Sequence, residues 1–177
     1  LELDELISLS QKADALQGAL LVPQMWGAEL LPMDAFLPYL TEAKLPIGAA
    51  FSAMLFRHGL ADVALQVWND NPYEPGEDSW YSELHWSFGA ECALEIGVTE
   101  LGAELYGRLL PLRGQAIIAG TGPAHGPADA YLACAAAAAG ERALAGAHAD
   151  EALRLCTEWN VPQAVRWLSD LRERHGF

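Results

Sequence analysis

The densest group of side chains able to bind a ligand lies between residues 80 and 88, where aromatic rings and polar groups alternate. This group contains Trp80, Tyr81, Glu83, His85 and Trp86. Because successive helical residues are rotated by about 100°, so many rings cannot all face one core stripe. We expect some of them to line a groove that binds a partner or ligand. The competing interpretation is that most of them pack between helices.

Two arginines beside a glycine-rich segment form a second candidate binding site. Arg108 and Arg113 come just before residues 114–127, where they could meet an acidic side chain or a ligand. A salt bridge to the acidic half of the chain is the alternative. The glycines do not predict a nucleotide site, because a phosphate-binding loop needs Gly-Lys-Ser/Thr at the start of a helix. No lysine occurs after Lys44.

Metal or acid–base chemistry has little support in the sequence. His148 and Glu151 lie one helical turn apart, and His85 shares a predicted helix with Glu91 and Glu95. Di-iron bundles use Glu-x-x-His on two helices, a spacing that is missing here. We interpret His148 as a hydrogen-bonded histidine between helices, and Glu91 and Glu95 as a solvated helix edge or a groove lining.

The cysteines and serines also fail to predict an enzyme. Cys92, Cys134 and Cys156 lie far apart among alanines and leucines, which predicts buried, reduced thiols rather than a disulfide framework or a zinc site. No Gly-x-Ser-x-Gly sequence is present. We predict a non-catalytic chain with no cofactor and no metal. A helical enzyme or metal protein is the less favoured alternative.

Charge is distributed unevenly along the 177 residues. The formal net charge of -14 lies entirely in residues 1–105, which hold 17 acidic and three basic side chains. Residues 106–177 are neutral, with seven of each. Because an acidic surface repels phosphate groups, we predict no direct contact with nucleic acid or with an anionic membrane. A basic partner with salt-sensitive affinity is expected instead.

The start of the chain is acidic and lacks the basic region and apolar run of a signal peptide. No uncharged apolar stretch reaches the roughly 18 residues of a membrane span. We therefore expect a cytoplasmic protein. The first residue is leucine, which suggests a domain taken from a longer chain.

Apolar residues recur at three- and four-residue steps, which predicts an all-α fold of about eight helices. Residues 1–45 are expected to form irregular helices. Further helices are expected over 46–58, 60–68, 79–96, 99–111, 127–140, 144–159 and 162–176. Asp78 or Ser79, and Thr99, are the expected N-caps. Residues 116–119 are expected to be briefly extended.

A repeat connects these helices. Three times a helix ends in glycine and another follows at once, at Gly59, Gly97 and Gly140, which are 38 and 43 residues apart. Five residues after these glycines stand Ala64, Gly102 and Ala145, and four residues further on stand Trp68, Tyr106 and Ala149. A small residue lets two antiparallel helices approach closely, and hairpins with apolar flanks must stack. We predict one domain over 1–177, with three degenerate hairpins over 46–159 and a capping helix over 162–176.

This pattern resembles the tetratricopeptide repeat, in which helix A ends near a glycine and helix B carries an alanine and an aromatic residue. The resemblance covers residues 46–159, although the spacing exceeds the family's usual 34 residues. A plain helical bundle is the alternative. Helix A residues line the concave surface of tetratricopeptide superhelices, which implies a groove at Trp80, Tyr81, Glu83 or Trp86.

Residues 105–156 also resemble the C-terminal helical region of large bacterial signalling ATPases and LuxR-type transcriptional regulators. The matching features are Leu105-Tyr106, Leu109-Leu110-Pro111, Gly120, Gly126, Gly140 and His148-Ala-x-Glu151-Ala-Leu153. The alanine-rich, lysine-poor composition suits an actinobacterial genome.

This second resemblance implies a regulatory or scaffold domain that binds a protein, a peptide or another domain of its own chain. Any NTPase module would then lie elsewhere in the parent protein. A small-molecule sensor with a pocket near 80–96 and 114–127 is the alternative.

Overall fold

The structure is a computed structural model that describes residues 25–26, 48–76, 79, 81–118 and 124–177. Helices predominate among these residues, so the all-α prediction is confirmed. The described α-helices are α4 (Gly48–Arg57), α5 (Ala61–Asp70), α6 (Ser82–Ile96), α7 (Thr99–Leu109), α8 (Ala128–Ala138), α9 (Arg142–Glu158) and α10 (Pro162–His175). The irregular helices predicted for residues 1–45 lie outside the described residues, apart from Met25 and Trp26.

The connection between α7 and α8 contains the remaining regular structure. A short 3-10 helix, η1 (Leu110–Leu112), follows α7, and strands β1 (Ala116–Ile118) and β2 (Ala124–Pro127) pair antiparallel. Ala116 lies opposite Pro127 and Ile118 opposite Ala124, with an irregular register between them. The predicted extended segment is therefore confirmed in part, while its pairing with β2 was not predictable from its own residues.

The three glycines that divide the predicted hairpins all adopt left-handed backbone conformations. The φ angles are 72° at Gly59, 75° at Gly97 and 84° at Gly140. Glycine has no Cβ to oppose this conformation, so it reverses the chain directly after a helix. The three predicted turns are confirmed.

The predicted side-chain caps are wrong. The residue before α6 is Tyr81 and the residue before α7 is Val98, and neither makes a side-chain capping hydrogen bond. Thr99 is the first residue of α7. A capping side chain accepts a hydrogen bond from a helix amide. Before α6 the backbone amide of Ser79 instead donates to the side-chain hydroxyl of Ser82, which is the first residue of the helix, at 2.7 Å. Asp78 lies outside the described residues.

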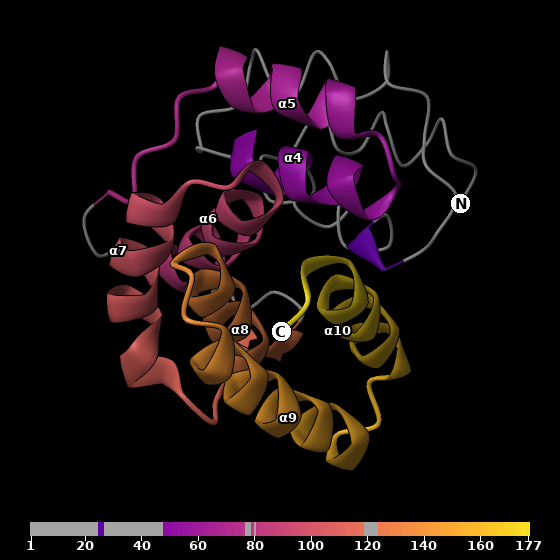
Figure 1. The fold of residues 1–177 in the computed structure, drawn as a ribbon. Helices are drawn as coiled ribbons and strands as arrows, with labels where there is room; N and C mark the ends of the chain where they lie inside the picture. Colours follow the sequence, from indigo (N-terminus) through magenta and orange to yellow (C-terminus); the bar gives the residue numbers. More distant parts are fainter. Residues whose placement is uncertain (1–24, 27–47, 77–78, 80, 119–123) are drawn as a thin grey trace.

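The first helix of each pair lies inside and the second lies outside. Helix α6 packs against α4 and α8, and α8 packs against α6, α7 and α9 (Figure 1). Of the 11 residues of α8, 10 are buried, because its alanines let several helices approach at once. In contrast, α5 buries only Ala64 and Val67. Most residues of the inner helices are thus buried.

The contact between α7 and α8 is especially close at Gly102. A Cβ at this position would lie 2.7 Å from the Cβ of Ala138 and 2.9 Å from the carbonyl oxygen of Ala135. The close partner is therefore α8, the first helix of the next pair, and not α6 of the same pair. The small residue at this position therefore lets α7 approach α8 closely.

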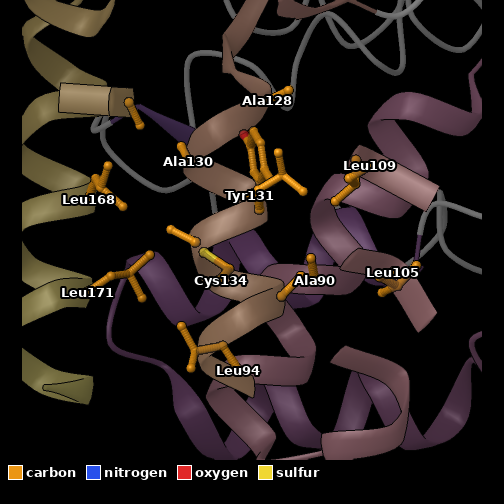
Figure 2. Close-up of a cluster of buried hydrophobic side chains, with 14 of the residues drawn as sticks. Ala90, Leu94, Leu105, Leu109, Ala128, Ala130, Tyr131, Cys134, Leu168 and Leu171 are labelled. Carbon is orange, nitrogen blue, oxygen red and sulfur yellow. The ribbon is translucent and has the colours of Figure 1, made fainter. Parts of the chain in front are cut away.

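Two apolar clusters share α6. One surrounds α4 and α5 and includes Phe88 and Cys92, and the other surrounds α8 and extends to α10. Figure 2 shows Leu168 and Leu171 of α10 directed toward α8 and its Cys134. Within the described residues, no helix is both long enough and apolar enough to cross a membrane.

Candidate functional site

Three predicted groove residues bind the chain's own loop, residues 71–76. The Trp86 indole donates to the carbonyl of Pro75 at 2.8 Å, and His85 Nε2 lies 2.8 Å from the carbonyl oxygen of Glu74. Arg108 donates to the carbonyl of Gly76 at 3.0 Å. Carbonyls of an extended loop need donors from elsewhere, and these side chains supply them. The rings of His85 and Trp86 are thus packed beneath a loop.

Tyr73 holds the same loop against α6. Its ring stacks on His85 with centroids 4.5 Å apart, and its phenol donates to the backbone carbonyl of His85 at 3.1 Å. A Cβ at Gly89 would overlap the Tyr73 ring, so this glycine makes room for the tyrosine. Burial raises the pKa of Tyr73 above its ordinary value. The structure gives this part of the predicted groove an internal role.

The other predicted groove residues are more dispersed. Tyr81 makes an edge contact with His85, and Glu83 is half-buried with its carbonyl accepting from Ser87. Arg113 is exposed and lies 3.8 Å from Asp129. Trp80 lies outside the described residues. Arg108 also pairs with Glu104, the kind of salt bridge that was the alternative to ligand binding. A role for these residues in partner binding stays a prediction.

His148 connects three helices through hydrogen bonds. Its Nδ1 lies 2.9 Å from Oδ1 of buried Asp129, and its Nε2 lies 3.1 Å from the phenol oxygen of Tyr106. The second Asp129 oxygen accepts the Gly114 amide at 2.7 Å. The order carboxylate, imidazole, hydroxyl is that of an acid–base triad. Because each carboxylate oxygen and each ring nitrogen binds a group of the fold, we interpret the set as an interhelical link, as predicted for His148.

Arg57 and Glu91 form an ion pair in the interior of the described part of the chain. The guanidinium donates to both carboxylate oxygens, at 2.8 and 2.7 Å, and the two side chains are 5% and 1% exposed. Burial alone would lower the pKa of Arg57, but the carboxylate of Glu91 outweighs it and raises the value. The expectation that Glu91 lies at a solvated edge or in a groove is wrong. It faces the interior, where only a paired charge is tolerated.

Two tryptophans enclose the Arg57 guanidinium. Its central carbon lies 4.5 Å from the ring centroid of Trp26 and 4.2 Å from that of Trp167. The Trp167 indole also donates to Glu91 at 2.9 Å. Cations bind favourably to aromatic faces, more so when desolvated. Residues from α4, α6 and α10 therefore meet in one charged cluster.

Tyr131 of α8 completes this cluster. Arg57 lies within 3.5 Å of its phenol oxygen, and the phenol donates to the carbonyl of His125 at 2.9 Å. Burial raises the pKa of Tyr131. Sequence reasoning missed this set because its members lie far apart in the chain. The available signal was Arg57, one of three basic residues in the first 105 and the one that ends an apolar helix.

No family model, no curated protein and no solved structure matches this chain.

The resemblances to the tetratricopeptide repeat and to the LuxR-type regulators therefore rest on the residues that carry them. Among the described residues, no group of three or more His, Cys, Asp or Glu side chains is arranged to hold a metal ion. What the described geometry offers is a set of interhelical contacts.

The three cysteines are free and buried, which confirms the predicted reduced thiols. Burial raises the pKa of Cys156 to about 11 and raises the pKa values of Cys92 and Cys134 well above their ordinary value. Thiolate is the reactive form of cysteine, so these thiols are unreactive near neutral pH.

His125 is the buried polar group with an unsatisfied atom. In the part of the chain that the structure describes, its Nδ1 has no hydrogen-bond partner, and its ring makes an edge contact with Phe88. Burial lowers the pKa of His125 to about 4, and the charge of Arg57 adds to this effect. The imidazole is neutral in the folded protein at neutral pH.

We expect this histidine to destabilise the protein in mild acid. Between pH 6.5 and 4 the unfolded chain binds a proton that the folded chain does not, so stability is complete above this window and falls by about 3 kcal/mol across it. His125→Phe should flatten this part of a plot of unfolding free energy against pH, measured by urea denaturation. His58→Phe is the control and should keep most of the slope. An unchanged slope in His125→Phe would contradict the assignment.

Proposed function

We propose that this chain is a non-catalytic regulatory domain that binds a protein or peptide partner. The observation that carries the proposal is that one face of the inner helices already holds a helix through defined side-chain contacts. This binding face consists of Arg57 of α4, Glu91 and Glu95 of α6, and Tyr131 of α8. The helix that it holds is α10. A surface that binds a helix within the chain has the chemistry to bind one from a partner.

The internal role of the polar clusters supports a binding rather than a catalytic function. Asp129, His148 and Tyr106 are hydrogen-bonded to one another, and Arg57 and Glu91 neutralise each other in the interior. General acid–base catalysis needs such groups within reach of a substrate. We infer that they define how the helices stack.

We extend the proposal to a cytoplasmic parent protein of the bacterial transcriptional-regulator or signalling-ATPase class. In such a parent, a bound partner would shift the equilibrium between inactive and active arrangements by binding one of them more tightly. The coding sequence around this segment tests the extension. A helix-turn-helix or NTPase module beside it would support the proposal, and neighbours of an unrelated class would oppose it.

Salt dependence is the first test of partner binding. With a net charge of -14, the chain should bind basic amphipathic peptides more tightly than acidic ones. Raising sodium chloride from about 0.05 M to about 0.5 M should weaken binding about tenfold, because salt screens exposed charges. Fluorescence anisotropy with a panel of labelled basic and acidic helical peptides measures both effects. Equal affinity for the two classes, or indifference to salt, would contradict the proposal.

A small-molecule sensor is the alternative, and a thermal-shift screen separates the two. A ligand present at 100 times its Kd stabilises the folded state by about 2.7 kcal/mol, which gives a clear rise in Tm. We expect no such rise across a panel of metabolites. A specific, saturable rise with one metabolite would favour the sensor.

A further inference from the structure

The last helix folds back onto the inner helices. Trp167 donates to Glu91, and Arg174 donates to both carboxylate oxygens of Glu95 at 2.9 and 2.7 Å, with His175 3.3 Å away. A helix that only caps a stack contacts the pair before it. Helix α10 packs against α9, and it also contacts α6 through these side chains and α4 through Arg57. In Figure 1 it lies below α4.

The contacts of α10 form a simple two-point pattern. Glu91 and Glu95 lie one turn apart on α6, and Trp167 and Arg174 lie two turns apart on α10. Between these points, Leu168 and Leu171 are fully buried against the apolar cluster of α8. Helix-in-groove recognition uses this combination of apolar anchors and charged positions along one helix face.

Helix α10 is much less deeply buried than the inner helix α8 against which it packs. Of its 14 residues only Ala164, Trp167, Leu168 and Leu171 are buried, whereas α8 is buried almost throughout. Three residues connect it to α9, and among them Asn160 has a φ of 56°, the positive φ of a non-glycine residue. Asparagine tolerates this left-handed conformation, which is common directly after a helix. The connection between α9 and α10 is therefore a short helix-ending turn, held by hydrogen bonds from Asn160 and Val161 back to α9.

Without α10, the binding face would be short of positive charge. Glu95 would lose Arg174 and His175, and Glu91 would lose the indole N–H while keeping Arg57. An incoming helix must therefore supply a donor for Glu91 and a cation for Glu95. Charge-assisted hydrogen bonds of this kind are strong and specific.

We propose that α10 is an intramolecular ligand of the binding face, and that the partner is a basic amphipathic helix that displaces it. The partner would carry a tryptophan followed seven residues later by an arginine, as α10 does. The identity of this partner rests on the proposed function, whereas the exchange of α10 does not. Because α10 competes at a high effective concentration, it lowers the apparent affinity for the partner. Weakening its docking should therefore strengthen binding of a helix in trans.

The test uses the full chain and a fluorescein-labelled synthetic peptide of residues 160–177. Arg174→Glu places two carboxylates together at Glu95, and Arg166→Glu is its matched control on an exposed position of the same helix. Trp167→Phe removes the donor to Glu91, and Trp159→Phe, at an exposed tryptophan, is its control. We expect Arg174→Glu and Trp167→Phe to bind the peptide about tenfold more tightly than the wild-type chain and both controls. A peptide that carries Trp167→Ala should not bind.

Hydrogen exchange makes each outcome decisive. In Arg174→Glu, the amides of α10 should exchange faster while those of α8 stay protected. Released α10 without peptide binding would overturn the proposal, because the face then does not accept a helix in trans. Equal exchange and equal peptide affinity in all variants would also overturn it. Concentration-dependent dimers of the wild-type chain would assign the face to α10 of a second copy and overturn the assignment to a partner.

Failure of this proposal differs from failure of the proposed function. The probe is the chain's own helix, so the exchange test does not involve a natural partner. If the 160–177 peptide replaces α10 but foreign basic helices show no salt-dependent binding, the proposed function and the identity of the partner are rejected, and the displacement of α10 still stands. Salt-dependent binding without exchange of α10 would reject the displacement of α10 alone.

Discussion

Replacing Arg57 by methionine is expected to lower the free energy of unfolding by about 3–5 kcal/mol, which is the range for removal of one partner from a buried ion pair. The carboxylate of Glu91 would stay in the interior with the Trp167 indole as its remaining donor. Methionine retains much of the apolar stem, so the loss comes mainly from the uncompensated charge. Urea denaturation at neutral pH measures the change.

The double variant Arg57→Met with Glu91→Met is the decisive control. Buried ion pairs replaced by apolar residues of similar volume are often neutral or stabilising, so the double variant should regain most of the stability that Arg57→Met loses. If both variants lose the same amount, stacking of the guanidinium between Trp26 and Trp167 accounts for the effect, and the charge explanation is wrong.

A pair of glycine substitutions on α7 should change stability in opposite directions. Gly102→Ala is expected to lower the free energy of unfolding by about 1–3 kcal/mol, because the new methyl group would meet Ala138 and the α8 backbone. Gly107→Ala is expected to raise it by about 0.5–1 kcal/mol, because alanine is the better helix former. A Cβ at Gly107 meets nothing within 4 Å.

Both substitutions make the same chemical change five residues apart on one helix, so each is the control for the other. Thermal or urea denaturation of the two variants and the wild-type chain measures the difference. A gain in stability from Gly102→Ala would show that α7 does not approach α8 as closely as the structure has it.

The buried charges and the last helix belong to the same arrangement. Arg57 contacts Trp167 on one side and Trp26 on the other, so a change at the ion pair also alters the contact that α10 makes. We therefore expect Arg57→Met to loosen α10 as well as to lower the global stability. Hydrogen exchange separates the two effects, because local release accelerates exchange in α10 beyond that of α8.

Local sequence patterns were sufficient for the helices and the turns. Apolar periodicity placed α4, α5, α9 and α10 within a few residues of their observed bounds, and glycine marked the reversals at Gly59, Gly97 and Gly140. These features depend on backbone sterics and on neighbours a few residues away, which the sequence displays directly. The cap predictions failed because the helices begin at other residues than expected: Tyr81 precedes α6, and Thr99 is itself the first residue of α7.

The candidate site shows the limit of such patterns. The rings of His85 and Trp86 were expected in a groove, yet they lie beneath the loop that contains Tyr73. A loop's path depends on which donors it meets, and these come from a helix further along the chain. Spacing along α6 could not reveal that the loop returns over it.

The sequence by itself determined the helical class, the positions of the turns, the uneven charge and the buried thiols. Only the tertiary structure decided that Glu91 faces inward and that Arg57, 34 residues earlier in the chain, neutralises it. It also decided that Trp167, 76 residues after Glu91, completes the cluster. The physical reason is that 11 of the 15 residues of α6 are buried, on several sides of the helix, so its pattern does not show which helices will cover which side. Burial of its charge becomes favourable only once the partners arrive from distant parts of the chain.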